Sequence, residues 1–476
     1  MKVLEAPGTP EAIEGEFLVQ FKTDKSLKNI ENGKNPAWLE KLGVGTKVDT
    51  QLSQFNIGRV RTSNPTATGQ WENLANILSS DPDIDFVEPN YVVHSFENGT
   101  PNDPLIDNMW FLKNISAFQA WDNNRPKQDV IVAVIDSGTH VLHEDFKGQI
   151  WVNEGEKPNN GIDDDQNGFI DDIFGWDFHD YDNAPVPNLY PRGYRKKGRC
   201  ITDESVKHYE SHGTHVAGTI AAMSNNNRGI AGIAPNVKIM SIKALGGPCG
   251  GGGSYGILNG LLYAVDNGAK IVNMSLGGYF HSRIAASIYQ QLSDKGILII
   301  AAAGNHAHDN DSRYRSYPAS YPFDGIISVA ASDQNDHLAD FSNYGAHNVD
   351  LAAPGVQILS TVPSGDGNIP EDAYVSKKGT SMAAPVVTGA AALLLANNPD
   401  LTNLQIKQML MNSVNKVPAL EGKVASGGRL NIDNALSQRV PRQHPPARRA
   451  RERDKEASGS VGGIRIFDNR SNQPKW

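Results

Sequence analysis

The sequence predicts a doubly wound parallel α/β fold for most of the chain, preceded by a small α+β unit. The first observation is a series of short, continuous runs of Val, Ile and Ala, which are typical of strands buried on both faces of a sheet. The second is that helical patterns separate these runs, as in consecutive β-α-β units. The third is that an N-terminal segment alternates apolar and polar residues, which indicates a half-buried strand of a different unit.

The N-terminal unit comprises residues 1–97. The alternation in "EFLVQFK", which begins at Glu16, predicts a strand. "WENLANILSS", which begins at Trp71, has a helical pattern, and the turn "SSDPD" separates it from a strand that ends in "VVHSF". One helix and two strands make this segment a small α+β domain.

A larger domain, residues 98–438, follows. Its predicted strands are "DVIVAVID" (129–136), "VKIMSIKAL" (237–245), "AKIVNMSLGG" (269–278), "GILIIAAAGN" (296–305) and "GIISVAAS" (325–332). Its clearest helical patterns are "SHGTHVAGTIAAMS" (211–224), "GILNGLLYAVDNG" (256–268) and the apolar run after "GTS" (379–381). Ligands of such sheets bind outside the carboxyl ends of the strands, and those ends here carry Asp136, residues 275–278 and Asn305.

The composition is that of a globular protein. The chain has 476 residues, of which 39% are hydrophobic and 20% charged, so it can form two or three domains with a large core. No window of about 18 unbroken apolar residues predicts a membrane span. The first twenty residues contain no apolar segment of a secretory signal. We expect a monomer that does not cross a membrane.

Charge is unevenly distributed along the chain. The formal net charge is −9, but the segment from Arg439 to Trp476 has ten Lys or Arg against four Asp or Glu, a balance of +6 that leaves −15 for the rest. This Pro- and Arg-rich tail, residues 439–476, is predicted to be disordered. The acidic body argues against nucleic acid as a partner and suits bound cations. The two cysteines, Cys200 and Cys249, form either one disulfide or two inert thiols.

Three polar motifs stand at element boundaries: "VAVIDSGTH" contains Asp136, "ESHGTHVAG" contains His212, and "GTSMAAP" contains Ser381. A serine hydroxyl is a weak nucleophile at neutral pH, and it needs an imidazole to take its proton and a carboxylate to orient that imidazole. In a fourth motif, "AAAGN", the Asn305 amide follows a buried strand, where it could donate to a developing oxyanion. Alternatively, Ser381 only caps the apolar helix, which would leave the other motifs unexplained.

These motifs resemble those of the subtilisin-type serine endopeptidases, the subtilases. They occur in the family's order of Asp, His and Ser, with "NMSLGG" and "AAAGN" between the last two, and the resemblance covers roughly residues 102–436. It implies that Ser381 is the nucleophile, His212 the general base and acid, Asp136 the orienting carboxylate and Asn305 an oxyanion donor. The implied activity is hydrolysis of protein or peptide substrates through an acyl-enzyme.

The resemblance also implies where substrate binds. Two backbone edges would hold an extended substrate: Gly250, Gly251 and Gly252, and opposite them Ser275, Leu276 and Gly277. Ala303 and Gly304 would form walls of the pocket for the residue before the scissile bond (P1). Ser316 would be the floor of that pocket, which favours large apolar P1 side chains.

Three alternative functions stay open. Asp309 and Asp311 are compatible with a kexin-like preference for paired basic residues, which needs acids in the pocket. The glycine-rich segment also matches a G-x-G-x-x-G pattern at Gly251, Gly253 and Gly256, a weak signal for a dinucleotide. The third alternative is an inert subtilase shell that only binds peptide.

Calcium ligands are predicted in two places. Between the Asp136 and His212 motifs, "DDDQNGFIDD" repeats the opening spacing of an EF-hand loop without its final Glu, and its candidate Ca²⁺ ligands are Asp163, Asp165, Asn167, Asp171 and Asp172. The resemblance implies a second site, formed by Asp103, Asp145, Asn225, Asn226 and Asn227. His215 lies three residues after His212 but lacks the spacing of a zinc helix, so we expect a hydrogen-bonded structural histidine.

The N-terminal unit resembles the inhibitory propeptide of secreted subtilases. The resemblance implies a zymogen that is inhibited by its own propeptide and cleaved between His94 and Gly99, and it implies a secreted or periplasmic location. The sequence therefore predicts a calcium-binding serine endopeptidase that is made as a self-inhibited zymogen.

Overall fold

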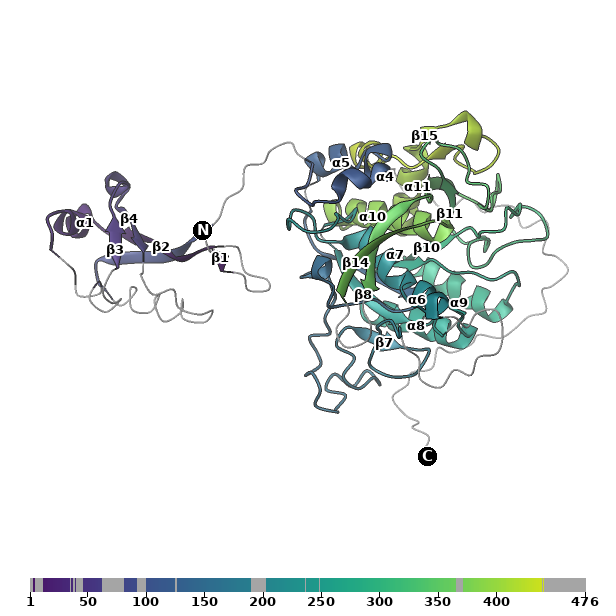
Figure 1. The fold of residues 1–476 in the computed structure, drawn as a ribbon, viewed down its shortest axis with the longest axis horizontal. Coiled ribbons are helices and arrows are strands. Elements are labelled where there is room, and N and C mark those ends of the chain that lie inside the picture. The colour runs from purple at the N-terminus through teal and green to yellow at the C-terminus, as the bar shows by residue number, and fades with distance from the viewer. Residues whose placement is uncertain are drawn as a thin grey trace. The chain divides into compact units, whose positions relative to one another are not determined.

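The computed structural model (Figure 1) describes residues 3–4, 12–34, 36, 39, 46–61, 81–91, 100–124, 126–189, 203–235, 237–247, 249–364, 371–438 and 440. The helix predicted at 71–80, the end of the strand at 92–96, the segment 94–99 and Cys200 lie outside these residues. Contacts divide the chain after Gln438, and Val440 alone of residues 439–476 is described.

The N-terminal unit contains an antiparallel sheet and one described helix of regular length. The central strand β2 pairs with β1, β4 and β5, and β3 extends the sheet beyond β4. The bounds are β1 Val3–Leu4, β2 Ala12–Phe21, β3 Lys47–Asp49, β4 Ile57–Arg61, β5 Ile84–Tyr91, α1 Asp24–Glu31 and the 3₁₀ helix η1 Ser53–Phe55. Alternate residues of β2, Phe17, Val19 and Phe21, are buried in one small core, so the predicted alternation is confirmed for this strand.

The rest of the described chain folds around a nine-stranded sheet. Its order is β15-β16-β12-β11-β10-β9-β6-β8-β7, and every adjacent pair is parallel except β15 with β16. The bounds are β6 Val130–Asp136, β7 Gly175–Asp177, β8 Val237–Lys243, β9 Ile271–Met274, β10 Leu298–Ala302, β11 Ile326–Ser332, β12 Leu351–Pro354, β15 Asn415–Lys416 and β16 Gly428–Arg429. All five predicted strands are confirmed, whereas β7, β12, β15 and β16 were not predicted because segments of two to four residues are too short to give a pattern.

Helices cover both faces of this sheet, and an antiparallel hairpin packs against α7. Their bounds are α4 Trp110–Asn114, α5 Ala117–Asn123, α6 Asp203–Glu210, α7 His212–Ala221, α8 Ser254–Asp266, α9 Arg283–Asp294, α10 Thr380–Asn397, α11 Asn403–Asn412, α12 Ile432–Ser437, β13 Ile358–Ser364 and β14 Glu371–Lys377. Single 3₁₀ turns, η2 Ile106–Asn108, η3 Glu144–Phe146 and η4 Pro418–Leu420, join some of them.

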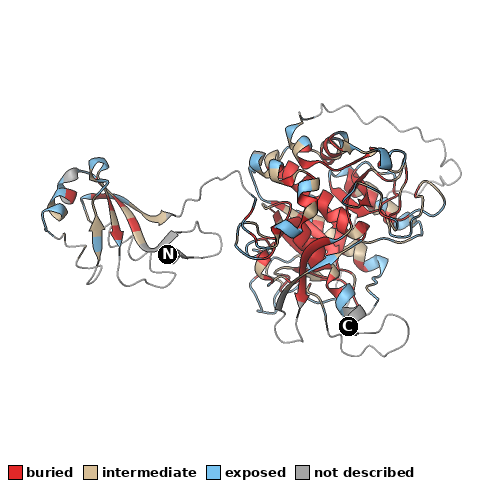
Figure 2. Cartoon of the chain, turned by 45° about the horizontal axis from the view of Figure 1, so that its top comes forward, coloured by how far each residue is buried: buried red, intermediate tan, exposed pale blue. Residues whose placement is uncertain are grey.

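Strand β6 shows why its sequence is continuously apolar. Val132 and Val134 point into a core formed with α7 and α10, whereas Ala133 and Ile135 point into a second core formed with α8 and α9. Because successive side chains alternate between the faces, a strand covered on both faces needs apolar residues at every position. The doubly wound parallel fold is therefore confirmed, and Figure 2 shows its buried centre in red.

Helix α10 is the most apolar element of the chain. Every residue of it except Ser381 and Asn397 is buried. Its window is long and apolar enough to cross a membrane, but 89% of that window is buried inside the domain, as for the core helix of a globular protein. Gly379 is its N-cap residue, so Ser381 lies inside the first turn and does not cap the helix.

Candidate active site

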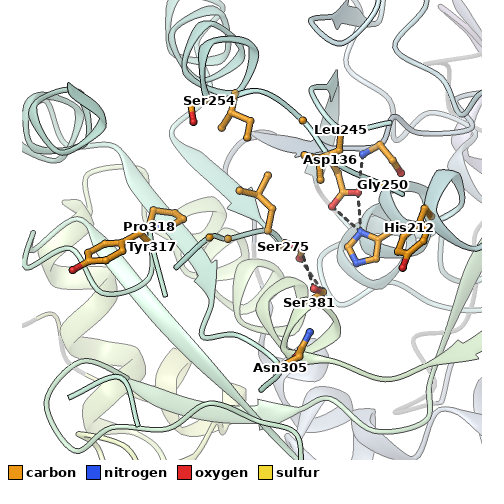
Figure 3. Close-up of a pocket in the computed structure, with 18 of the residues that line it drawn as sticks. Asp136, His212, Leu245, Gly250, Ser254, Ser275, Asn305, Tyr317, Pro318 and Ser381 are labelled. Carbon is orange, nitrogen blue, oxygen red and sulfur yellow. Dashed lines mark hydrogen bonds and ion pairs between the residues drawn. The ribbon is translucent and has the colours of Figure 1, made fainter. Parts of the chain in front are cut away.

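Asp136 and His212 are joined directly at the carboxyl end of the sheet (Figure 3). Asp136 is the last residue of β6 and His212 the first of α7, and His212 Nδ1 lies 2.8 Å from Asp136 Oδ1 and 3.0 Å from Oδ2. An ionised carboxylate can only accept a hydrogen bond. Nδ1 therefore carries the ring proton and donates a hydrogen bond to Asp136. The other ring nitrogen, Nε2, is then free of its proton and can act as a base.

The backbone around this pair permits its close contact. Ser137 Oγ donates to Glu210 O at 2.9 Å and accepts from Gly213 N at 3.0 Å, so it ties the end of β6 to the start of α7. A side chain at residue 213 would place its Cβ 2.4 Å from Gly138 O, so only glycine fits after His212. The glycine of the "HGTH" motif is thereby explained.

Ser381 lies beside the edge that the sequence assigns to substrate. Its Oγ donates to Ser275 O at 3.1 Å, while Ser275 Oγ donates to Ser381 O at 2.7 Å. Between these described side chains, no hydrogen bond joins Ser381 Oγ to His212. Such bonds are often absent before substrate binds, and a change of the Ser381 rotamer would redirect the hydroxyl.

Asn305 follows β10 and is fixed by its carbonyl end. Asn305 Oδ1 accepts from Thr380 N at 2.8 Å and from Thr380 Oγ1 at 2.9 Å. Its Nδ2 donates to no acceptor among the described residues, and the same holds for the backbone N–H of Ser381. Two N–H donors at the start of α10 are therefore available to a negatively charged oxygen.

These four residues line one cleft of about 750 Å³. Both predicted substrate edges line it as well: Gly250, Gly251 and Gly252, and Ser275, Leu276 and Gly277. Beyond the second edge, Phe280, Tyr317 and Pro318 give the cleft an apolar wall. In Figure 3, Tyr317 and Pro318 lie to one side of Ser381 and His212 to the other.

Three of the predicted pocket residues do not line this cleft. Ser316 is buried behind Gly277, where a Cβ would meet Ser316 Oγ at 2.9 Å, and Ala303 is fully buried in a small core of its own. Gly304 turns away and donates its N–H to Thr380 Oγ1. The sequence assigned these residues by position along a motif, whereas the orientation of each side chain decides which atoms reach the cleft.

The acids of the kexin-like alternative also lie outside the lining. Asp309 Oδ1 accepts from Asp311 N at 2.9 Å. Both oxygens of Asp311 accept from residues of the loop at 347–348. Asp136 is the only carboxylate among the described residues that line the cleft, so none of these residues supplies a further acid to a basic P1 side chain.

Comparisons with known proteins agree with this geometry. A profile of the subtilase family matches residues 127–437. The chain belongs to the subtilase family. It is therefore a serine endopeptidase, as its curated relatives are. The thermophilic serine proteinase of Bacillus sp. (strain AK1) is 32% identical over 428 residues, covering 89% of this chain and 88% of the relative.

Two other relatives and one solved structure are also similar to this subtilase. Thermitase of Thermoactinomyces vulgaris is 32% identical and covers 71% of this chain and 99% of thermitase. The halolysin-like extracellular serine protease Nep of Natrialba magadii is 34% identical, covering 77% of this chain and 58% of Nep. The structure of a protease from Pseudoalteromonas arctica PAMC 21717 has a TM-score of 0.55 at 29% identity, covering 71% of this chain and 99% of that chain.

Sequence reasoning missed a buried ion pair behind the subtilase site. Lys243 Nζ donates to Glu210 Oε2 at 2.7 Å, and both side chains are only 1% exposed. Lys243 also donates to Ser137 O at 3.1 Å, and Glu210 Oε1 accepts from Gly247 N at 2.7 Å. The pair thus connects Ser137, which follows β6, and Gly247, which follows β8, to Glu210. Glu210 lies two residues before His212. The sequence contained one indication of this pair, which is Lys243 at the end of an apolar strand. A buried charge of this kind needs a partner of opposite charge.

His215 is the predicted structural histidine. Its ring is fully buried, and its Nε2 donates to Ile358 O and Val375 O at 2.9 and 3.1 Å. Burial, together with the charge of Lys377, holds the pKa of His215 well below its ordinary value. Because the folded protein favours neutral His215, this residue lowers the free energy of unfolding as pH falls below about 6.5, where the unfolded histidine takes up a proton.

The structure gathers the ligands predicted near the start of this domain. Asp103 accepts from the backbone N–H groups of Asn225 and Asn226, and Asn226 Nδ2 donates to Asp145 Oδ1 at 2.9 Å. Burial, with a smaller contribution from the Asp145 charge, raises the pKa of Asp103. The backbone N–H of Asn227 donates to Asn102 Oδ1, next to Asp103. Asp103 and Asp145 together offer carboxylate oxygens, the ligands that suit Ca²⁺.

The acidic insert brings two of its predicted ligands, Asp165 and Asp172, together with Glu156. Glu156, Asp165 and Asp172 place carboxylate oxygens within 4.8 Å of one another. Asn167 Nδ2 donates to Asp165 and Asp172. The expected ligands Asp163 and Asp171 are not among these three residues, and their oxygens accept from backbone N–H groups of the loop, at 167–168 and 160–161. Glu156 precedes the acidic run and was not predicted.

One of the two cysteines, Cys249, lies within the described residues. Cys249 is disulfide-bonded, and the described residues contain no free cysteine. Cys249 lines the cleft next to Gly250, so the bond constrains the segment that carries one substrate edge.

Proposed function

We propose that this subtilase cleaves peptide bonds through an acyl-enzyme on Ser381, and that it is made as a calcium-stabilised zymogen. The observation that carries the catalytic assignment is the meeting of Asp136, His212, Ser381 and Asn305 around one cleft, each from a different element. Each residue has the chemistry that one role requires, and Asn305 Nδ2 and Ser381 N, which have no acceptor among the described residues, are donors of the kind that an oxyanion needs.

In the first step, Ser381 Oγ attacks the substrate carbonyl carbon and passes its proton to His212 Nε2. Asp136 keeps the ring oriented and stabilises the imidazolium that results. The carbonyl oxygen becomes an oxyanion that accepts from Asn305 Nδ2 and Ser381 N. His212 then gives its proton to the leaving amine as the carbon–nitrogen bond breaks. A water molecule then attacks the carbonyl carbon of the ester and passes a proton to His212 Nε2. The bond to Ser381 Oγ breaks as His212 returns that proton to it, which releases the acid product.

The lining of the cleft supports a preference for large apolar P1 side chains. Leu276, Phe280 and Tyr317 present apolar surface next to the Ser275 to Gly277 edge, and glycines on both edges let an extended backbone approach closely. We propose that the N-terminal domain, residues 1–97, is an inhibitory propeptide of the catalytic domain, residues 98–438, and that the enzyme is exported, as the extracellular Natrialba relative is.

Autoprocessing tests the zymogen proposal. The full chain and its Ser381→Ala variant are expressed with Ca²⁺ present and followed by intact mass. We expect the wild type alone to lose a fragment that ends between residues 94 and 99, because only the wild type has a nucleophile. Full-length protein in both samples would contradict self-cleavage, and cleavage in both would assign the cut to another protease.

Calcium is proposed at the two carboxylate clusters. Ca²⁺ prefers oxygen ligands. Asp103 and Asp145 supply them from buried positions, and in the second cluster Glu156 and Asp172 are buried whereas Asp165 is exposed. Carboxylates so close repel one another unless a cation neutralises them. When bound, Ca²⁺ would supply that neutralising charge and join the loops of each cluster.

Removal of calcium should therefore lower the melting temperature. In the Ser381→Ala background, which prevents self-digestion, Ca²⁺ at about a hundred times its Kd should raise the free energy of unfolding by about 2.7 kcal/mol, or Tm by about 5 to 10 °C. Asp103→Asn and Glu156→Gln should each reduce the shift seen on chelation, measured by calorimetry. Asp400→Asn, an exposed acid in neither cluster, is the control. An unchanged Tm after chelation would refute both sites.

A further inference from the structure

Two lysine side chains lie at one end of the cleft. Lys377 and Lys378 line it together with His208, Tyr209 and His212, and Asp136, the only carboxylate among the described lining residues, is already bonded to His212. Lys378 is exposed and makes no ion pair within the described part of the chain. This is unusual for a protein whose net charge is −9.

Chemistry identifies which part of the substrate lies at this end. The acyl part of the substrate runs between the glycine edge and the Ser275 to Gly277 edge. Since His212 protonates the leaving amine, the leaving group must lie against the His212 side of Ser381. Lys377 is on that side, because its Nζ donates to Ser211 Oγ at 2.9 Å and to His208 O at 3.0 Å.

These two hydrogen bonds hold Lys377 in place without neutralising it. Both acceptors are uncharged, and an ammonium group has three donors, so one N–H of Lys377 stays available. The bonds also anchor the β14 end to Ser211, the N-cap residue of α7. A fixed ammonium loses little side-chain entropy when a ligand binds, which favours a charge-assisted hydrogen bond.

We propose that Lys377, assisted by Lys378, forms a basic subsite that selects Asp or Glu at the first position after the scissile bond (P1′). The proposal rests on the proposed catalytic roles of Ser381 and His212, which define the leaving-group side. A charge-assisted hydrogen bond of this kind corresponds to about a tenfold preference in kcat/KM for Glu over Gln.

The surroundings of Lys377 give the preference a pH dependence. Burial lowers the pKa of Lys377 to about 8, an effect partly opposed by Asp136. The other titratable groups that face it are His208 on α6, and His212 and His215 on α7. Burial and Lys377 lower the pKa values of His208 and His215, so these two stay neutral at pH 7. The preference should fall as pH rises through about 8, where Lys377 loses its charge.

The test uses internally quenched peptides that share one apolar P1 residue and differ only in Glu, Gln or Lys at P1′. The processed enzyme is assayed at pH 7 and low salt, and mass spectrometry identifies the bond that is cut. The readout is the ratio of kcat/KM for the Glu peptide to that for the Gln peptide, which a general loss of folded enzyme does not change.

In the wild type this ratio should be about ten, and added salt should reduce it. Lys377→Gln should bring it close to one, Lys377→Arg should retain it in part, and Lys378→Gln should lower it less. Lys270→Gln, which removes an exposed lysine that does not line the cleft, should keep the wild-type ratio.

Two results would overturn the proposal, and they differ. Equal cleavage of the Glu and Gln peptides by the wild type would refute the basic subsite and leave the catalytic assignment intact. Failure of processed enzyme to cut any of the peptides at the expected bond would refute the assumed catalytic geometry, and the subsite with it.

Discussion

Substitution of Ser381 by alanine is expected to reduce kcat by about a millionfold, the loss found when the serine of such a triad is removed. The reason is that no other nucleophile among the described residues is placed to replace it. Ser275 has a hydroxyl in this cleft, but its Oγ donates to Ser381 O at 2.7 Å and the residue is only 4% exposed. Asn305 and the cleft would still bind substrate, so KM should change little. The measurement is steady-state hydrolysis of a quenched peptide by processed enzyme.

Because Ser381→Ala should also block self-processing, that variant is activated in trans by a trace of wild type, which is subtracted in a blank. Ser287→Ala, on the exposed side of α9, removes a hydroxyl that does not line the cleft and should keep full activity. Substantial turnover by Ser381→Ala would show that the hydroxyl is not the nucleophile.

Replacement of Asp136 by asparagine should reduce kcat by about ten-thousandfold with little change in folding. The introduced amide would keep an oxygen for Ser137 N, which lies 2.7 Å from Asp136 Oδ1, and would turn its NH₂ group toward His212. The ring would then accept at Nδ1 and carry its proton on Nε2, the nitrogen that must receive the serine proton. The base would be lost although every heavy atom stayed in place.

Circular dichroism and Tm separate this effect from misfolding, and Asp129→Asn is the matched control. Asp129 immediately precedes the same strand and its side chain is 56% exposed, so the same change of charge there should leave kcat unaltered. A loss of less than tenfold in Asp136→Asn would mean that another group sets the tautomer of His212.

Local patterns predicted the elements of this fold well. The apolar runs at 129–136 and 296–305 gave strands because a strand covered on both faces must be apolar throughout, and α10 was predicted to be buried because it has no polar face. The same patterns placed Asp136 and Asn305 at strand ends. The carboxyl ends of parallel strands lie along the same edge of a sheet. The sequence by itself therefore determined that these polar groups face a common cleft.

Only the tertiary structure decided which side chains complete the sites. Glu210 and Lys243 lie 33 residues apart and form a buried pair, and Glu156 joins Asp172 from beyond the predicted loop. Lys377 reaches Ser211 across 166 residues, while Ser316 turns behind Gly277 and away from the cleft. Sequence reports spacing along the chain, whereas partners and side-chain directions depend on how segments distant in sequence pack, so contacts of this kind become visible only in the fold.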